Sequence, residues 1–155
     1  MTDDEIQALI RRIRAERPNR DLTAAVALAL GWTTGPSRAG WKLVAPHATV
    51  GGMVMAPPEA TMPAVVWFDP EGQERGGIVG SRDETLPPWL TSLDAALGAV
   101  PCDRRARLLY HAIMNHAAWL IQAEREDPAL DRLPAFIVAE LLDDRGEPEP
   151  QPVVP

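Results

Sequence analysis

A helical pattern of apolar residues opens the chain. Thr2 and Glu5 stand three residues apart, which is the spacing of a capping box at a helix N-terminus. Four apolar residues then recur at the spacing of one helical face: Ile6, Leu9, Ile10 and Ile13. This pattern predicts an amphipathic helix that ends near Pro18, because proline does not continue a helix.

A second helix is predicted from Leu22 to Leu30. Asp21 precedes it as the expected N-cap, and Gly31 follows it where helices commonly end. The residues between these two are apolar on nearly every side of the helix. We therefore expect this helix to be buried.

The next part of the chain predicts β-structure. Prolines and glycines punctuate residues 32–63, which leaves room for one short strand at Trp41–Val44 and otherwise loop. The β-branched and aromatic run Ala64–Phe68 is followed by the turn sequence Asp69–Gly72 and a second extended segment. Residues 64–79 are therefore predicted to form a β-hairpin.

Three more helices are predicted in the second half. Thr91 or Ser92 is expected to cap a helix that Pro101 ends, and Pro134 suits the first turn of a last helix that stops at Gly146. Between them a helix of about six turns is predicted from residue 103. Its broad apolar stripe comprises Ala106, Leu109, Tyr110, Ile113, Ala117, Leu120 and Ile121.

These elements predict an α+β fold. A small central antiparallel sheet, formed by the strand near 41–44 and the hairpin near 64–79, is expected to pack with about five helices. Neither an internal repeat nor a long polar linker interrupts residues 1–146, so we expect a single domain there. The acidic, proline-rich residues 147–155 are expected to be a disordered tail.

Composition and charge narrow the function classes. The 155 residues are 46% hydrophobic and 24% charged, as in ordinary globular proteins. Fifteen Lys and Arg against 22 Asp and Glu give a net charge of −7, which repels a phosphate backbone, so direct nucleic-acid binding is not expected. No membrane span and no signal peptide are expected either. The lone Cys102 favours a reducing compartment, the cytoplasm.

The search for chemistry predicts no cofactor, no metal site and no catalytic residue. His111 and His116 are five residues apart on a predicted helix, so their side chains diverge by about 140°. The G-x-S-x-G, G-x-x-x-x-G-K-[ST] and G-x-G-x-x-G motifs are absent. The alternative is a small enzyme with an unrecognised active site built from scattered residues: Ser92, Asp94, Cys102, His111 and His116.

Five residues are candidates for binding a partner protein. Met53 and Met55 lie in an apolar segment without periodicity, which either covers the core or forms a pliable contact surface. Trp89 stands on a proline-rich loop and could anchor a partner. Asp143 and Asp144 are an acidic pair that suits a basic partner.

The segment LPPWLTSLDAAL (residues 86–97), continuing to Val100-Pro101, resembles the signature of the phage ABA sandwich domain family. A helix that ends Leu30-Gly31-Trp32 and a last helix that begins Leu133-Pro134-Ala135 agree with this resemblance. Between Pro101 and Pro134 the chain departs from the family pattern, since the family has strands where we predict the long helix. The resemblance implies a small phage or prophage protein without an established activity or catalytic residues.

The leading hypothesis is therefore a non-enzymatic, phage-encoded accessory protein that binds another protein. The partner would be a host or phage protein, such as one with a basic nucleic-acid-binding surface, and the specific form of the hypothesis is an inhibitor of host defence of the anti-CRISPR type. The alternatives are the small enzyme described above and a phage structural or assembly protein.

Overall fold

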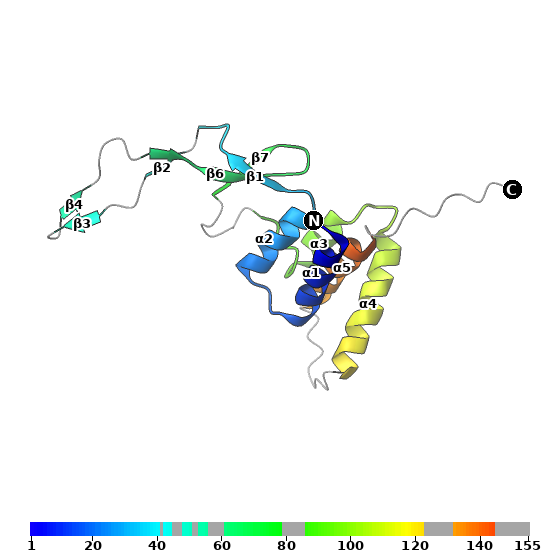
Figure 1. The fold of residues 1–155 in the computed structure, drawn as a ribbon. Coiled ribbons are helices and arrows are strands. Elements are labelled where there is room, and N and C mark those ends of the chain that lie inside the picture. Colours follow the sequence, from blue (N-terminus) through cyan, green and yellow to red (C-terminus); the bar gives the residue numbers. More distant parts are fainter. Residues whose placement is uncertain are drawn as a thin grey trace. The chain divides into compact units, whose positions relative to one another are not determined.

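The computed structural model describes residues 1–40, 42–44, 48–50, 53–55, 61–78, 86–122 and 132–144. The contacts of the chain group into two compact units. We call residues 1–30 with 87–155 the helical unit and residues 31–86 the sheet unit, and we describe each by itself. The described residues confirm the α+β class, with five helices and a three-stranded antiparallel sheet (Figure 1).

Helix α1 spans Asp3–Ala15 and begins with the predicted capping box. The Thr2 N–H donates to Glu5 Oε2 (2.6 Å), and the Glu5 N–H donates to Thr2 Oγ1 (3.3 Å). The backbone hydrogen bond from Thr2, together with its side chain, lowers the pKa of Glu5. Three residues of the predicted apolar face are buried, namely Leu9, Ile10 and Ile13.

Helix α2 spans Arg20–Ala29, and its N-cap is Asn19 instead of the expected Asp21. Asn19 Oδ1 accepts from the Leu22 N–H at 2.8 Å, whereas Asp21 lies inside the first turn, where a negative charge favours the helix dipole. The helix is also not buried on every side, because Leu28 is 51% exposed. Its core face consists of Leu22, Val26 and Ala27.

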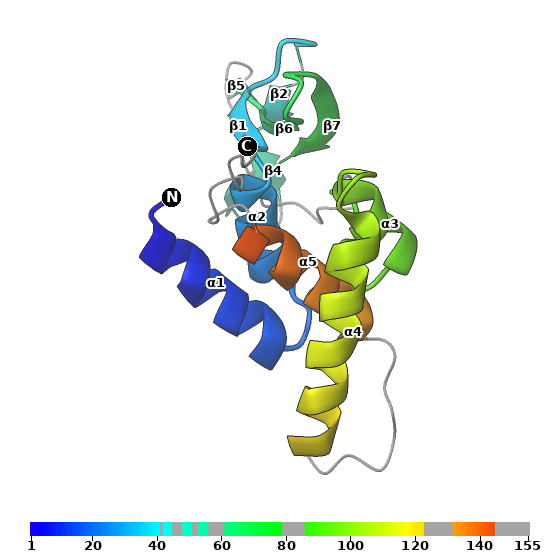
Figure 2. The same cartoon turned by 90° about the vertical axis from the view of Figure 1, so that its right-hand side faces the viewer.

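Three helices complete the helical unit: α3 (Leu93–Ala99), α4 (Arg105–Gln122) and α5 (Leu133–Asp144). The family resemblance implies strands in this part of the chain, whereas the periodicity predicts a long helix. Residues 105–122 are helical. Helix α5 contacts α1, α3 and α4, and every residue from Pro134 to Leu142 is buried. Figure 2 shows α5 between α1 and α4. The core of the helical unit is therefore built around α5.

The sheet of the sheet unit has the strand order β1-β6-β7. Strands β6 (Val65–Phe68) and β7 (Glu74–Ile78) form the predicted hairpin. The third strand, β1 (Thr33–Pro36), was predicted as loop; it pairs with β6 from Thr33↔Phe68 to Pro36↔Val65. Pairing with β6 offsets the poor strand propensity of glycine and proline, and the proline stands at the strand end, where a missing N–H costs least.

The predicted strand near 41–44 is present but does not join this sheet. It is β2 (Lys42–Val44), which pairs with β5 (Thr61–Pro63). A further antiparallel pair consists of β3 (Ala48–Val50) and β4 (Met53–Met55). The prediction of a sheet formed by residues 41–44 and the hairpin is therefore wrong in its strand composition, since pairing partners depend on contacts distant in sequence.

Two carboxylates organise the hairpin turn and its surroundings. Burial opposes the ionisation of Asp69, but hydrogen bonds from the Gln73 N–H, the Arg75 side chain and the Glu71 N–H outweigh it and lower the pKa of this group. The Ser37 hydroxyl, and then the N–H groups of the next two residues, lower the pKa of Glu74 in the same way. Both carboxylates stay ionised and satisfy backbone donors.

Several sequence predictions lie outside the described residues. They concern Trp41, His47, Val79, Gly146 and the tail at 147–155.

Candidate functional site

Helix α4 has a buried face that packs in the helical unit. Leu108, Ala112 and His116 are its buried residues, and they follow one another at intervals of four. The His116 ring stacks on Trp119 with 6.0 Å between the ring centroids and meets Phe136 of α5 edge-on at 5.3 Å. This face holds α4 against α5.

The opposite side of α4 carries large apolar side chains that are exposed. The exposed fractions are 62% for Tyr110, 47% for Ile113, 53% for Met114 and 77% for Ile121. Ala106 and Ala117 are exposed on the same side. At about 100° per residue these six positions fill an arc of roughly 100°, centred about 150° from the centre of the buried face. We call these six residues the outer stripe of α4.

The outer stripe corrects the prediction of which α4 face is buried. The expected apolar face comprises seven residues, and five of them are exposed: Ala106, Tyr110, Ile113, Ala117 and Ile121. Leu109 and Leu120 are half-buried at the border between the two faces. Apolar residues surround most of this helix, so periodicity alone did not indicate which face meets α5. The contacts of α5 select the face centred on Ala112.

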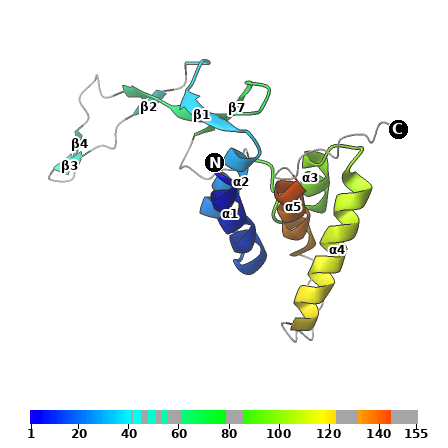
Figure 3. The same ribbon diagram turned by 45° about the vertical axis from the view of Figure 1, so that its right-hand side comes forward.

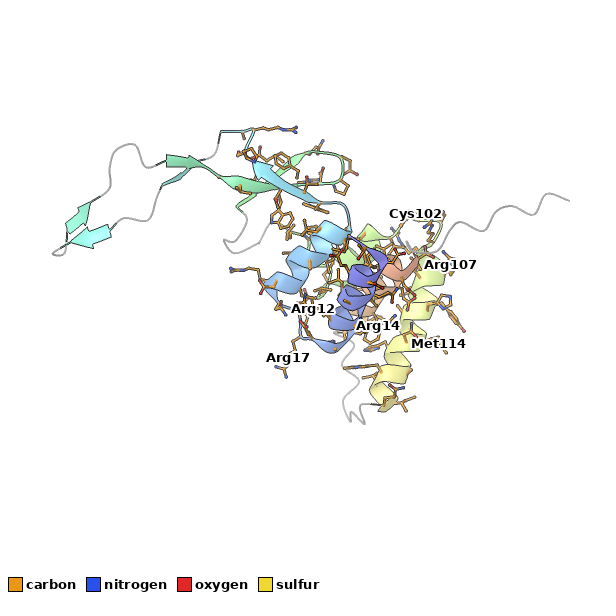
Figure 4. All side chains as sticks on the ribbon, in the orientation of Figure 1. Arg12, Arg14, Arg17, Cys102, Arg107 and Met114 are labelled. Atoms are coloured by element: carbon orange, nitrogen blue, oxygen red, sulfur yellow. The ribbon has the colours of Figure 1, made fainter. Side chains whose placement is uncertain are left out.

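The position of α4 explains the exposure of the outer stripe. Within the helical unit α4 lies at the edge, with α5 on one side of it (Figure 3). Figure 4 shows Met114 on the side of α4 that points away from α1. Among the described residues, α4 therefore contributes one face to the core and presents the other to solvent.

A small polar cavity lies beside the first half of α4. Its volume is about 200 Å³, and it is lined by Arg107, Leu108, His111, Glu140, Asp143 and Asp144. Asp144 Oδ2 accepts from Arg104 Nη1 (3.1 Å), and Oδ1 accepts from Arg107 Nη2 (2.8 Å). Asp143 is exposed and accepts from Gln7 Nε2 at 3.1 Å. The two predicted acidic residues therefore differ, since two guanidinium groups compensate the charge of Asp144.

Glu140 joins three helices at the same cavity. Its side chain accepts from Arg14 Nη2 of α1 at 3.1 Å and from the Asn115 side-chain amide of α4. Glu140 itself is 8% exposed, so these bonds replace the water that its charge has lost. The hydrogen bonds of Glu140, Asp143 and Asp144 therefore hold α1, α4 and α5 together, and we assign the cavity no chemistry.

The other predicted partner-binding residues are not part of the outer stripe. Trp89 is 4% exposed, so its ring belongs to the core and is not a free surface anchor. A tryptophan on a proline-rich loop packs inward because its large apolar ring gains most from burial. The backbone of Met53 and Met55 lies in β4, and their side chains are outside what the structure describes.

The residues of the alternative enzyme hypothesis differ in their hydrogen bonds and in their exposure to solvent. The Ser92 hydroxyl accepts from the Ala95 N–H at 3.3 Å as the N-cap of α3. Cys102 is exposed, His111 is exposed and His116 is buried, so the two histidines have different surroundings, as their divergence predicted.

Within the described ranges, no three or more His, Cys, Asp and Glu side chains are arranged to hold a metal ion. No helix in the same ranges has the length and apolar content to cross a membrane.

Sequence reasoning missed the outer stripe as a surface, although a signal for it was present. Positions 108, 109, 112 and 113 are all apolar, and together they cover a wider arc of the helix than the single core-facing stripe of a peripheral helix requires.

Comparisons of the chain with family models, with curated proteins and with solved structures found no match.

Proposed function

We propose that this protein acts by binding another protein chain and that the outer stripe of α4 is its contact surface. One observation carries the proposal: four large apolar side chains on one side of one helix are each about half exposed or more. Removing such surface from water on binding is favourable by roughly 25 cal/mol per Å².

The size of the stripe supports this function. From their exposed fractions, the four large side chains present roughly 500 Å² to solvent, which lies toward the upper end of the largest apolar patches on monomeric proteins. A rigid helix that exposes a narrow apolar band is the geometry by which helices dock on apolar grooves or on other helices.

We propose that the partner is a host or phage protein in the bacterial cytoplasm. More specifically, we propose that this protein inhibits a host defence complex that has a basic nucleic-acid-binding surface. The net charge of −7 and the family resemblance support this. So does an acidic corner of the helical unit: Asp3 and Asp4 are exposed in the first turn of α1, and Gln7, one turn later, bonds the exposed Asp143 of α5. The acidic corner would meet a basic partner.

Affinity capture from bacterial lysate with matched variants tests both surfaces. The double variant Ile113→Gln/Ile121→Gln makes the outer stripe polar without changing charge, and Asp3→Asn/Asp143→Asn neutralises part of the acidic corner. Leu28→Gln is the control, because Leu28 is an equally exposed apolar residue of α2.

We expect a protein retained by the wild type and by Leu28→Gln to be lost with the stripe variant. Loss only with the Asp3/Asp143 variant would assign binding to the acidic corner. Equal retention by all variants would contradict both assignments.

A further inference from the structure

The pattern of large and small residues in the outer stripe specifies its partner. We propose that the stripe pairs with the same stripe of a second copy of this chain, with the two α4 helices antiparallel. This inference rests on the proposed function, in which the outer stripe is a contact surface.

The outer stripe is complementary to itself when it is reversed. Around a two-fold axis between residues 113 and 114, Ala106 lies opposite Ile121 of the second copy. In the same register Tyr110 lies opposite Ala117, and Ile113 lies opposite Met114. Two of these three layers set a large side chain against alanine, and the central layer joins two side chains of similar size. Alternation of large and small residues across facing positions is what lets helices interdigitate.

The spacing of the stripe also suits a helix pair. Residues 106, 110, 113, 117 and 121 are separated by four, three, four and four positions. Steps of three and four keep side chains on one seam between two packed helices. At 1.5 Å per residue the seam is about 22 Å long, which allows about four turns of each helix to engage.

The charges of α4 favour the antiparallel direction. The helix contains no acidic residue, and its charged residues, Arg105 and Arg107, both lie in the first turn. Arg105 lies on the core side of the helix and donates to the Val100 carbonyl, and Arg107 pairs with Asp144 but is still about half exposed beside the stripe. A parallel pair would place the two Arg107 side chains at the same end of the seam. The antiparallel pair separates them and sets the N-terminus of each α4 near the C-terminus of the other, the negative end of the helix dipole.

Because of the same charge distribution, the outer stripe and the acidic corner suit different partners. Helix α4 has no acidic residue that could pair with a basic nucleic-acid-binding surface. A second copy needs none, because the seam is apolar and the arginines lie at its ends. The outer stripe therefore suits self-association, while the acidic corner binds a basic partner. A dimer presents the acidic corner twice, so capture of that partner depends on the stripe through avidity.

The area of the stripe predicts how strong the pairing is. Roughly 500 Å² per copy is below the ~800 Å² per partner of a standard stable interface. We therefore expect an equilibrium between monomer and dimer with a dissociation constant in the micromolar range.

Sedimentation equilibrium of the purified chain in reducing buffer tests the pairing. The reductant prevents disulfide formation through the exposed Cys102. The mean mass should rise from the 16.9 kDa of one chain toward twice that value between about 1 and 100 µM. Ile113→Gln/Ile121→Gln should weaken the dimer about tenfold or more, and Leu28→Gln should leave it unchanged.

Single cysteines in a Cys102→Ser background test the direction. Ile113→Cys lies beside the two-fold axis and should form a disulfide-linked dimer under mild oxidation. Ala106→Cys should not, since the two copies of residue 106 are about 22 Å apart along the antiparallel seam. Efficient linking by both variants would indicate parallel helices and overturn the antiparallel register.

The outcomes distinguish this inference from the proposed function. A wild-type chain that stays monomeric up to about 100 µM, while the stripe variant still loses a captured protein, would overturn self-pairing and keep protein binding. A chain that dimerises through α4 only after residues 145–155 are removed would identify that segment as the occupant of the stripe and overturn self-pairing in the full chain. Neither dimerisation nor stripe-dependent capture would contradict both proposals.

Discussion

Helices α4 and α5 pack against each other, and both are rich in apolar residues, but they use those residues differently. In α5 every residue from Pro134 to Leu142 is buried, because α1, α3 and α4 surround the helix. In α4, which is six residues longer, Leu108, Ala112 and His116 are the buried residues, and the outer stripe is exposed. The number of neighbours around a helix, and not its apolar content alone, determines how much of it is core.

The difference separates two uses of an apolar side chain. In α5 such a side chain contributes to the stability of the monomer, since burial removes it from water during folding. In the outer stripe the same chemistry contributes nothing to the core and is available for association. Substitutions should therefore affect stability in α5 and association in the outer stripe.

The largest expected effect is at the centre of the contact between the two helices. Phe136 is 2% exposed and its ring meets His116 and Trp119 of α4. Phe136→Ala should lower the free energy of unfolding by about 3–5 kcal/mol, because it leaves a cavity in the core. Urea denaturation measures the loss, with Phe136→Leu as the milder control. A loss below about 1 kcal/mol would show that α5 is not the centre of the core.

A smaller effect is expected on the buried face of α4. Leu108 is 3% exposed, and Leu108→Ala should cost about 2–4 kcal/mol in the free energy of unfolding. Thermal denaturation followed by circular dichroism gives the comparison with Ile113→Ala on the outer stripe. If the order of the two losses were reversed, the assignment of the α4 faces would be wrong.

The polar contact among α1, α4 and α5 should have an intermediate effect. Glu140→Gln removes the charge that Arg14 pairs with but keeps an acceptor for Asn115, and about 1–2 kcal/mol of stability should be lost. Arg14 is 36% exposed, so solvent screening limits the effect.

The exposed pair Arg12–Glu16 gives the control for this measurement. Glu16→Gln should leave the free energy of unfolding nearly unchanged, because both partners are exposed and water screens their attraction. Equal losses for Glu140→Gln and Glu16→Gln would mean that the Glu140 contact adds nothing beyond a surface ion pair.

The smallest effect on monomer stability is expected in the outer stripe. Ile113→Ala should change the free energy of unfolding by no more than about 0.5 kcal/mol when measured well below the dissociation constant of the dimer. A loss of about 2 kcal/mol or more at high dilution would show that another part of the same chain covers the stripe.

Local features were predictable from the sequence because their causes are local. The capping box of Thr2 and Glu5, the Ser92 cap and the hairpin turn each depend on residues within a few positions of one another. The cap of α2 was assigned two residues too late, since Asn19 and Asp21 are both good caps and the choice depends on where the chain leaves the preceding turn.

Contacts between distant segments were not predictable in the same way. Thr33–Pro36 has the composition of a loop and becomes a strand because β6, about thirty positions later, supplies the backbone partners. Likewise the sequence indicates Trp89 and the acidic pair as surface residues. Trp89 is buried and Asp144 pairs with two arginines, whereas Asp143 is exposed.

The sequence by itself determined the α+β class, the existence of the five helices and the apolar content of each. Only the tertiary structure decided that α5 is enclosed and that α4 turns Leu108, Ala112 and His116 inward. The physical reason is that periodicity records how apolar residues are distributed around one helix, whereas burial depends on which other elements arrive to cover them. On α4 the described neighbours cover one of two apolar faces, and the uncovered face is the candidate site.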